Sequence, residues 1–391
     1  MTRRDCSQRM RRPLGLLAVA LSLSACGGRQ TAPTAASAAD SSHSAAAPAH
    51  PTVEAPETGP NNVGPQGDSS QGVLDAAIKP DEPGCSAAVG IDGNVVWAGV
   101  RGIANMATAA EIGTVTVFDI GSTSKQFTAT AILLLVEAGK LTLDDRVSQH
   151  VSGLPAWADS VTVAQLMHHT SGIPDYIGLL RAEGYQYGDR TTQDQALKAL
   201  ASAPNLEFEP GTKYEYSNSN YLLLGEIVSR VSGEPLPEFL SAEIFRPLGL
   251  AMVMEPNAKL PNKAVSYERG DDGEYLVADS AWEQIGDGGI QTTPTQLVRW
   301  ADNYRTGKVG GQKLLDAQLA GAVETEPGGD ERYGAGIALE ADGTLDHGGA
   351  WAGFVTAFRI SKDRHTSVAV SCNADSRDPA AIAGSLGRLW M

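Results

Sequence analysis

Ser122 and Lys125 are the residues of this 391-residue chain whose types and spacing most directly allow chemistry. Gly121 and Ser122 form a small-residue turn before an apolar run, 127–136, which predicts a buried helix of about four turns. If the helix begins at or just before Ser122, the serine and the lysine share one face. The hydroxyl then lies beside an amine and near free backbone N–H groups at the positive end of the helix dipole. An acyl-transfer nucleophile needs these three parts: a hydroxyl, a proton acceptor and donors for an oxyanion.

Taken alone, Ser-x-x-Lys is a weak signal. A chain of this length and composition contains about one such match by chance. An N-cap serine followed by a solvated lysine is the simpler interpretation of an isolated match. The rest of the chain therefore has to decide between the two interpretations.

The elements that would position this pair follow from the order of apolar runs. Two β-type runs, 86–91 and 95–100, flank Asp92-Gly93-Asn94, which is a strong hairpin signal. The chain closes with three further β-type runs and a helix, at 345–348, 354–360, 366–372 and 378–390. The segments between are mostly helical. Strands at both ends predict an α/β (α+β) fold, in which one antiparallel sheet is built from both chain ends, flanked by helices, with a mostly helical insertion lobe.

Three short motifs stand in order along the chain: Ser122-x-x-Lys125, Tyr216-Ser217-Asn218 and His347-Gly348-Gly349. In this combination the chain resembles the serine β-lactamase and penicillin-binding-protein superfamily, specifically its class C-like branch of β-lactamases, DD-peptidases and esterases. The resemblance runs from about residue 72 to the C-terminus. It includes further landmarks in family order, at 168–175, 210–212, 247–250, 288–290 and 333–336. It implies a β-lactamase/transpeptidase-like fold and makes Ser122-x-x-Lys125 a nucleophile motif.

The family's mechanism, mapped onto these positions, implies that Ser122 attacks a carbonyl and forms an acyl-enzyme. Lys125 would take or relay its proton, and Tyr216 would act as the base or share that role. A free tyrosine titrates near about 10, so Tyr216 works near neutrality only if adjacent cations lower its pKa. Asn218 would orient Lys125 and donate to the amide oxygen of the substrate. The backbone N–H groups of Ser122 and Ala350 would form the oxyanion hole.

The third motif departs from the family pattern. This chain has His347-Gly348-Gly349, the predicted substrate-binding strand, where the best-known members carry Lys-Thr-Gly. Arg305-Thr306-Gly307 fits that pattern superficially, but it follows a helix instead of opening a strand. Lysine is a permanent cation that can hold a substrate carboxylate, whereas histidine titrates near about 6.5. The change therefore puts carboxylate recognition, as in β-lactams and D-Ala-D-Ala peptides, in doubt and favours neutral esters or amides.

These residues predict a serine hydrolase that cleaves an ester or amide (peptide) substrate in the bacterial cell envelope through an acyl-enzyme at Ser122. A D-alanyl-D-alanine carboxypeptidase or endopeptidase and a β-lactamase stay open as alternatives. A lipoprotein that binds peptidoglycan or a partner without catalysis is an alternative of another class. The set Ser122, Lys125 and Tyr216 argues against it, because a binding module needs no such set.

We expect a monomer that acts without metal or cofactor. No His, Cys or carboxylate cluster has metal-ligand spacing, and His168 and His169 are expected to cap and pack a helix end. The net charge is −16, and removing the first 25 residues, whose net charge is +4, leaves −20. Such an acidic surface argues against nucleic acid and against electrostatic docking on anionic lipid.

The first 25 residues have the pattern of an export signal. Five arginines precede an apolar core, 14–23, that is too short for a stable membrane anchor. The sequence around Cys26 resembles a bacterial lipoprotein cleavage box, which implies that Cys26 is lipidated and held at a membrane. An ordinary signal peptide that ends near a cysteine is the alternative. Residues 26–71 are poor in large apolar side chains and are expected to be a disordered linker, before a folded domain at 72–391.

Cys85 and Cys372 remain once Cys6 leaves with the signal and Cys26 carries lipid. Cys85 opens the first predicted strand and Cys372 ends the last. In the family these strands are antiparallel neighbours, so the resemblance implies that the two cysteines lie close together. A disulfide in an oxidising envelope and a pair of buried thiols are both open.

Overall fold

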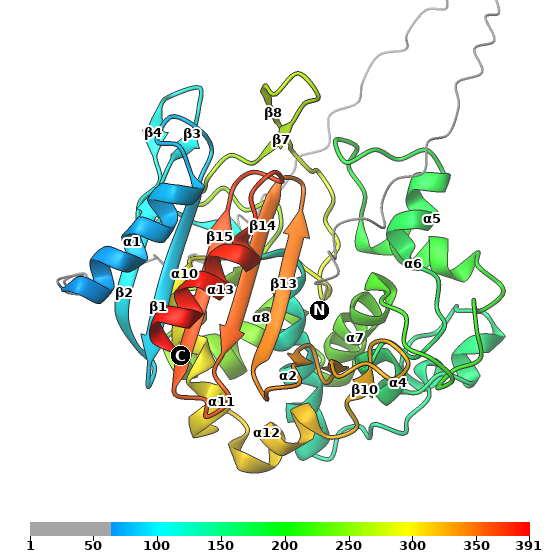
Figure 1. Cartoon of the computed structure of the whole chain (residues 1–391). Coiled ribbons are helices and arrows are strands. Elements are labelled where there is room, and N and C mark those ends of the chain that lie inside the picture. Colours follow the sequence, from blue (N-terminus) through cyan, green and yellow to red (C-terminus); the bar gives the residue numbers. More distant parts are fainter. Residues whose placement is uncertain (1–63) are drawn as a thin grey trace, which may run out of the picture. The chain divides into compact units, whose positions relative to one another are not determined.

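The computed structural model describes residues 64–391 (Figure 1). The predicted signal 1–25, the lipidation site Cys26 and most of the predicted linker lie outside the described residues. The first described helix, α1 (Pro65–Ala77), begins before the predicted domain boundary at residue 72. The assignment of 65–71 to the linker is therefore wrong.

Helix α1 forms because it packs against the C-terminal helix α13 (Pro379–Trp390). Leu74 is fully buried, and the indole N–H of Trp390 donates to the hydroxyl of Ser70 at 2.8 Å. Pro65 occupies the first helical position, where its missing N–H costs nothing. A sequence with few large apolar side chains is thus ordered by a partner at the other end of the chain.

An eight-stranded antiparallel sheet forms the centre of the fold, with the strand order β10-β11-β12-β13-β14-β15-β1-β2. Its strands are β1 (Cys85–Ile91), β2 (Asn94–Arg101), β10 (Val323–Glu324), β11 (Arg332–Tyr333), β12 (Ala338–Leu339), β13 (Leu345–Trp351), β14 (Phe354–Ile360) and β15 (Thr366–Cys372). The N-terminal hairpin β1–β2 pairs directly with β15, in the register Cys85↔Cys372 and Val89↔Val368. In Figure 1 the blue hairpin accordingly lies beside the red strands. The prediction of one sheet built from both chain ends is confirmed.

Helices cover both faces of this sheet (Figure 1). Along β1, Ala87 and Val89 point into the core under α1 and α13, whereas Ala88 points into the larger core on the other face. This alternation follows from the two-residue period of a strand. The larger core contains α10 (Pro294–Ala301) and the helix α2 (Lys125–Glu137), which carries the predicted Lys125.

The predicted helical insertion lies between β2 and β10. Its other α-helices are α3 (Val147–His150), α4 (Val163–Met167), α5 (Tyr176–Ala182), α6 (Gln193–Ala201), α7 (Asn218–Ser232), α8 (Leu236–Leu240), α9 (Arg246–Leu248), α11 (Asn303–Thr306) and α12 (Gly311–Leu319). Short strands precede these helices or lie between them: β3 (Ile103–Asn105), β4 (Ala110–Glu111), β5 (Phe118–Asp119), β6 (Val253–Met254), β7 (Tyr267–Arg269), β8 (Tyr275–Val277) and β9 (Ile290–Thr292). Among residues 64–391, no helix is both long and apolar enough to cross a bilayer.

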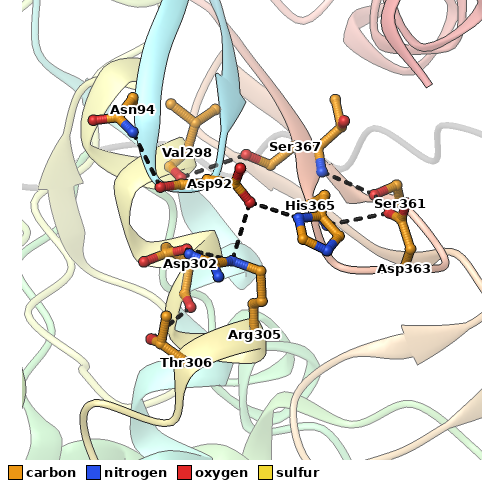
Figure 2. A network of polar contacts seen from close by, with 11 residues as sticks. Asp92, Asn94, Val298, Asp302, Arg305, Thr306, Ser361, Asp363, His365 and Ser367 are labelled. Carbon is orange, nitrogen blue, oxygen red and sulfur yellow. Dashed lines mark hydrogen bonds and ion pairs between the residues drawn. The ribbon is translucent and has the colours of Figure 1, made fainter.

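A set of half-buried and exposed polar side chains, here called the turn network, contacts the β1–β2 turn (Figure 2). Asp92 lies in that turn and contacts Arg305 at the end of α10–α11, with 3.3 Å between Nε and Oδ1. The same carboxylate contacts His365 in the β14–β15 turn, with 2.6 Å between Nδ1 and Oδ1. Asp302 and Asp363 complete the network, through Arg305 and the backbone N–H of His365. Two turns and helix α11, which are distant in sequence, are thus linked at the surface.

Cys85 and Cys372 face each other across the β1–β15 pair. Their Cα atoms are 4.0 Å apart and their sulfurs are bonded in the structure. The bond connects residues 287 positions apart and lies in the core under α1 and α13.

Candidate active site

Ser122 lies in a tight helical turn, Gly121–Ser124, that leads directly into α2. The turn begins after β5, where the carboxylate of Asp119 accepts the backbone N–H of Gly121 at 2.8 Å and the side-chain amide of Gln291 at 2.6 Å. The helix therefore starts at the position expected from the sequence, but its first turn is 3₁₀ in type. Lys125, three residues later, is fully buried, and its Nζ lies 3.0 Å from Ser122 Oγ.

Two glycines allow this turn to touch strand β13. A Cβ atom on Gly349 would lie 2.0 Å from the carbonyl oxygen of Ile120 and 3.1 Å from the backbone nitrogen of Ser122. Gly121 has a positive φ of 51°, and its Cβ would lie 2.8 Å from the nitrogen of Ala350. Only glycine permits backbones to approach so closely. The backbones that carry the nitrogens of Ser122 and Ala350 therefore lie in close contact, at the place where the sequence predicts an oxyanion hole.

The later part of β13 presents an edge beside Ser122. Within the described chain, β12 pairs only with Leu345 and Asp346 of β13, while β14 pairs with the whole strand on its other side. Gly348 and Ala350 are exposed. An unpaired strand edge can hydrogen-bond to an extended backbone or an amide of a ligand.

Three hydrogen bonds fix the amine of Lys125. Its Nζ lies 2.9 Å from Asn218 Oδ1, 2.7 Å from the backbone oxygen of Asp287 and 3.0 Å from Ser122 Oγ. The amide and carbonyl oxygens can only accept, so each requires a proton of the amine. The hydroxyl of Ser122 can accept or donate. A neutral Lys125 therefore satisfies both oxygens and still offers its lone pair to Ser122.

Asn218 is oriented by Asp175, which the sequence reasoning did not single out. Asp175 Oδ2 accepts both the backbone N–H and the side-chain Nδ2–H of Asn218, at 2.8 and 2.9 Å. Its Oδ1 caps α5 through the N–H of Ile177. Because the Asn218 nitrogen faces Asp175, the Asn218 oxygen faces Lys125. The contact between the Asn218 oxygen and Lys125 Nζ is the geometry by which Asn218 could orient Lys125, as the sequence predicts.

Burial lowers the pKa of Lys125 to about 8, and the negative charges of Asp287 and Asp175 oppose that shift. The cause is that an ammonium group loses hydration when its side chain is completely enclosed. A substantial fraction of Lys125 is therefore neutral slightly above neutral pH, so this residue can accept a proton there.

Tyr216 lies beside the pair, with its ring centroid 4.9 Å from Lys125 Nζ. Although 38% of the tyrosine is exposed, desolvation raises the pKa of its phenol, and a hydrogen bond to Ser122 lowers it only in part. The condition under which Tyr216 could be the resting base, a pKa depressed by adjacent cations, is not met. Its ring stacks on His169 at 4.3 Å between centroids.

His169 contacts the N-terminal end of α7, where the sequence predicts that it caps and packs a helix end. Its Nδ1 accepts from the backbone N–H of Ser217 and the amide of Asn220, at 3.2 and 3.0 Å. Burial lowers its pKa well below the ordinary value, so the ring is neutral. His168 ends α4 and donates from Nδ1 to the carbonyl of Ala164. Within residues 64–391, no three His, Cys, Asp or Glu side chains are arranged to hold a metal ion.

His347 is a neutral, fixed group. Its Nδ1 donates to the carbonyl of Gly348 at 2.6 Å, so its Nε2 accepts the hydroxyl of Tyr333 at 2.9 Å. Burial and the charge of Lys125 lower the pKa of His347 to about 4. It therefore supplies no positive charge at the edge of β13, which agrees with the doubt about carboxylate recognition.

The sequence reasoning missed Asp175, Asp287 and Tyr333 as members of the site. Asp175 and Tyr333 belong to segments that resemble family landmarks, and Asp287 directly precedes another such segment. Asp175 contacts Asn218 from 43 positions away, and Lys125 reaches the carbonyl of Asp287 across 162 positions. No local pattern of spacing reports such contacts.

Similarity to known proteins shows the family of this chain. The model of the family described as Beta-lactamase matches residues 71–388. The chain belongs to the beta-lactamase family. A penicillin-binding protein 4* of Bacillus subtilis is 28% identical over 284 residues, which are 68% of this chain and 62% of the relative. A D-aminopeptidase of Cereibacter sphaeroides is 29% identical over 313 residues, which are 78% of this chain and 59% of the relative.

A solved structure with a similar fold adds to this comparison. The octameric penicillin-binding protein homologue from Pyrococcus abyssi is 27% identical, with a TM-score of 0.68 over 77% of this chain and 72% of that chain. This beta-lactamase family chain spans less than two thirds of the length of the two relatives above.

Proposed function

We propose that Ser122 is an acyl-forming nucleophile and that neutral Lys125 takes its proton. The observation that carries this proposal is the hydrogen-bond set of Lys125, in which two pure acceptors take two protons and leave the lone pair facing Ser122 Oγ. The depressed pKa of about 8 makes this neutral form accessible. Tyr216, whose phenol stays protonated, serves as a proton donor.

The reaction proceeds in two balanced halves. Ser122 Oγ forms a bond to the substrate carbonyl carbon while its proton passes to Lys125 Nζ. The oxyanion lies between the N–H groups of Ser122 and Ala350. The bond to the leaving nitrogen or oxygen breaks as Tyr216 donates its hydroxyl proton and regains one from Lys125. Water then attacks the acyl-enzyme, giving one proton to Lys125, which returns it to Ser122 Oγ as that oxygen leaves.

Neutral esters and amides are the proposed substrate class. Burial and the charge of Lys125 lower the pKa of His347 to about 4, so His347 supplies no cation for a substrate carboxylate. The free edge of β13 supports binding of an amide or a short peptide backbone. A D-alanyl-D-alanine carboxypeptidase or endopeptidase and a β-lactamase remain the alternatives, and the D-aminopeptidase relative favours amides of D-amino acids among the candidates.

A matched panel tests this proposal. The panel contains a p-nitrophenyl ester, a D-alanine p-nitroanilide, a D-Ala-D-Ala peptide and a penicillin, each with wild type and Ser122→Ala. We expect turnover of the ester and the anilide to exceed that of the two carboxylate-bearing compounds, and to be lost in Ser122→Ala. The reverse order would favour cell-wall peptides or β-lactams as the substrates. Equal turnover by both proteins would remove Ser122 as nucleophile, and no turnover of any compound would favour the binding lipoprotein.

We further propose that the protein is an exported lipoprotein of the bacterial envelope, anchored through Cys26, and a monomer. The export signal and the cysteine after Leu-Ser-Ala support the anchor. Mass spectrometry of the mature N-terminus tests it, because an unmodified Cys26 or cleavage elsewhere contradicts lipidation. Light scattering tests the monomer, against the octamer of the Pyrococcus abyssi homologue.

A further inference from the structure

The carboxyl group of Asp287 is buried beside Lys125 and has no part in the mechanism above. Only 7% of the residue is exposed. Its Oδ2 accepts the hydroxyl of Tyr176 at 3.1 Å, and its Oδ1 has no hydrogen-bond partner in the described chain. A buried carboxylate with so few hydrogen bonds is costly unless an opposite charge stabilises it. The backbone carbonyl of the same residue holds Lys125 Nζ at 2.7 Å, so that opposite charge lies close by.

The other polar groups around Lys125 and Asp287 do not form an ion pair with either of them. Asp175 is already satisfied, because its carboxylate accepts three N–H groups, two from Asn218 and one from Ile177. The remaining titratable groups that face Lys125 or Asp287 are neutral phenols and imidazoles: Tyr176, Tyr216, Tyr221, His169 and His347. Among the described residues named here, Lys125 is therefore the one that can supply a positive charge to Asp287.

We propose that Asp287, held by Tyr176, is a positioning residue whose carboxylate is the counter-ion of Lys125 and stabilises the ammonium formed when Lys125 takes the Ser122 proton. The proposal rests on the function proposed above, since it assigns Lys125 as the base. It parallels the role of a buried aspartate behind a catalytic histidine, which stabilises the protonated base without taking the proton.

The direction of the pKa shifts agrees with this pairing. Burial raises the pKa of Asp287 to about 6, and the charge of Lys125 is the largest influence that opposes the rise. Burial lowers the pKa of Lys125 to about 8, and the charge of Asp287 is the largest influence that opposes the fall. Between these values both groups are charged. The acylation rate should therefore rise with pH and reach half of its plateau near the Lys125 pKa.

The test is the pH dependence of acylation of the full chain by a fluorophosphonate, measured as intact-mass adduct between pH 5.5 and 9.5. In Asp287→Asn the attraction that favours the ammonium is gone, so Lys125 loses its proton at lower pH. We expect the midpoint to fall by about one pH unit, with a lower plateau because the base is weaker. Tyr176→Phe, which removes one hydrogen bond to the carboxylate, should lower the midpoint by less. The matched control Asp92→Asn, which removes an exposed carboxylate, should leave the midpoint unchanged.

A folded Asp287→Asn protein with the wild-type midpoint would overturn the proposal, even if its plateau fell, because a purely structural role changes only the plateau. If Asp287→Asn does not fold, the midpoint of Tyr176→Phe decides in the same way. Absence of any adduct in wild type would defeat the proposed function alone. An NMR titration of ε-¹³C-lysine would then test the pairing separately: a lower Lys125 midpoint in Asp287→Asn supports it, and an equal midpoint overturns it.

Discussion

The cluster around Lys125 and the turn network of Asp92 both join carboxylates, a basic side chain and a histidine, but one is buried and the other is exposed. Lys125 is fully enclosed, whereas 46% of the Asp92 side chain and 54% of the His365 side chain are accessible. Burial changes the pKa of Lys125, Asp287 and His347, while water screens the contacts of the turn network. The same kinds of side chain are therefore proposed to do chemistry in one place, and in the other they link two turns to helix α11.

The largest expected effect is that of Lys125→Met in the buried cluster. Methionine fills the space of the lysine stem but cannot accept a proton, so acylation should slow by about 10²–10⁴-fold. Stopped-flow acylation by the fluorophosphonate measures this loss, and a thermal unfolding curve shows whether the variant is folded. Acylation within tenfold of wild type would contradict the role of Lys125 as base.

We expect the second-largest loss of acylation rate from Gly349→Ala, because this change displaces the backbone. The new methyl group would lie 2.0 Å from the carbonyl of Ile120, so β13 and the Ser122 turn must separate. We expect a loss of about 10²–10³-fold in the plateau acylation rate, the size of one lost oxyanion donor, with the midpoint pH unchanged. Gly72→Ala in α1 is the control, since a Cβ there meets nothing within 4 Å. Equal rates for the two variants would count against the oxyanion hole.

A smaller effect, a change in substrate preference, is expected for His347→Lys. It replaces a neutral imidazole by a cation at the edge of β13, so the rate ratio of carboxylate-bearing to neutral substrates should rise by about 10-fold or more. The matched variant His347→Gln keeps the position neutral and should leave the ratio near that of wild type. The panel of four substrates gives this ratio directly. An unchanged ratio in His347→Lys would show that this position does not select on substrate charge.

The smallest effect is expected in the turn network, from Asp92→Asn. The change removes contacts to Arg305 and His365, both partly exposed, so the free energy of unfolding should fall by less than about 1 kcal/mol. Urea unfolding measures it, and acylation should stay within twofold of wild type. A loss above 3 kcal/mol, or a slower acylation, would break the contrast between the two networks.

Much of this fold can be predicted from local sequence, and the reasons are specific. Asp92-Gly93 marks the first hairpin, and the apolar β-type runs locate β14 and β15 at the residues where the structure has them. Ser122 and Lys125 are a local pair, so their spacing already fixes a shared face. Helix α1 could not be predicted, because its stability depends on α13, more than 300 positions later.

The residues that orient the site were equally difficult to predict from the sequence. Asp175, Asp287 and Tyr333 act through contacts with Asn218, Lys125 and His347 that only the tertiary structure brings together. The protonation of Tyr216 depends on desolvation, which the sequence does not report. Sequence therefore predicts which residues could react, and the structure is needed to show which charge each of them carries.

The most direct test of the central claim is the intact mass of the full chain after exposure to a fluorophosphonate and, separately, to a penicillin. The account predicts one adduct per chain from the fluorophosphonate, absent in Ser122→Ala and formed faster at pH 9 than at pH 6. An adduct that persists in Ser122→Ala, or no adduct from either reagent, would contradict the assignment of Ser122 as an activated nucleophile.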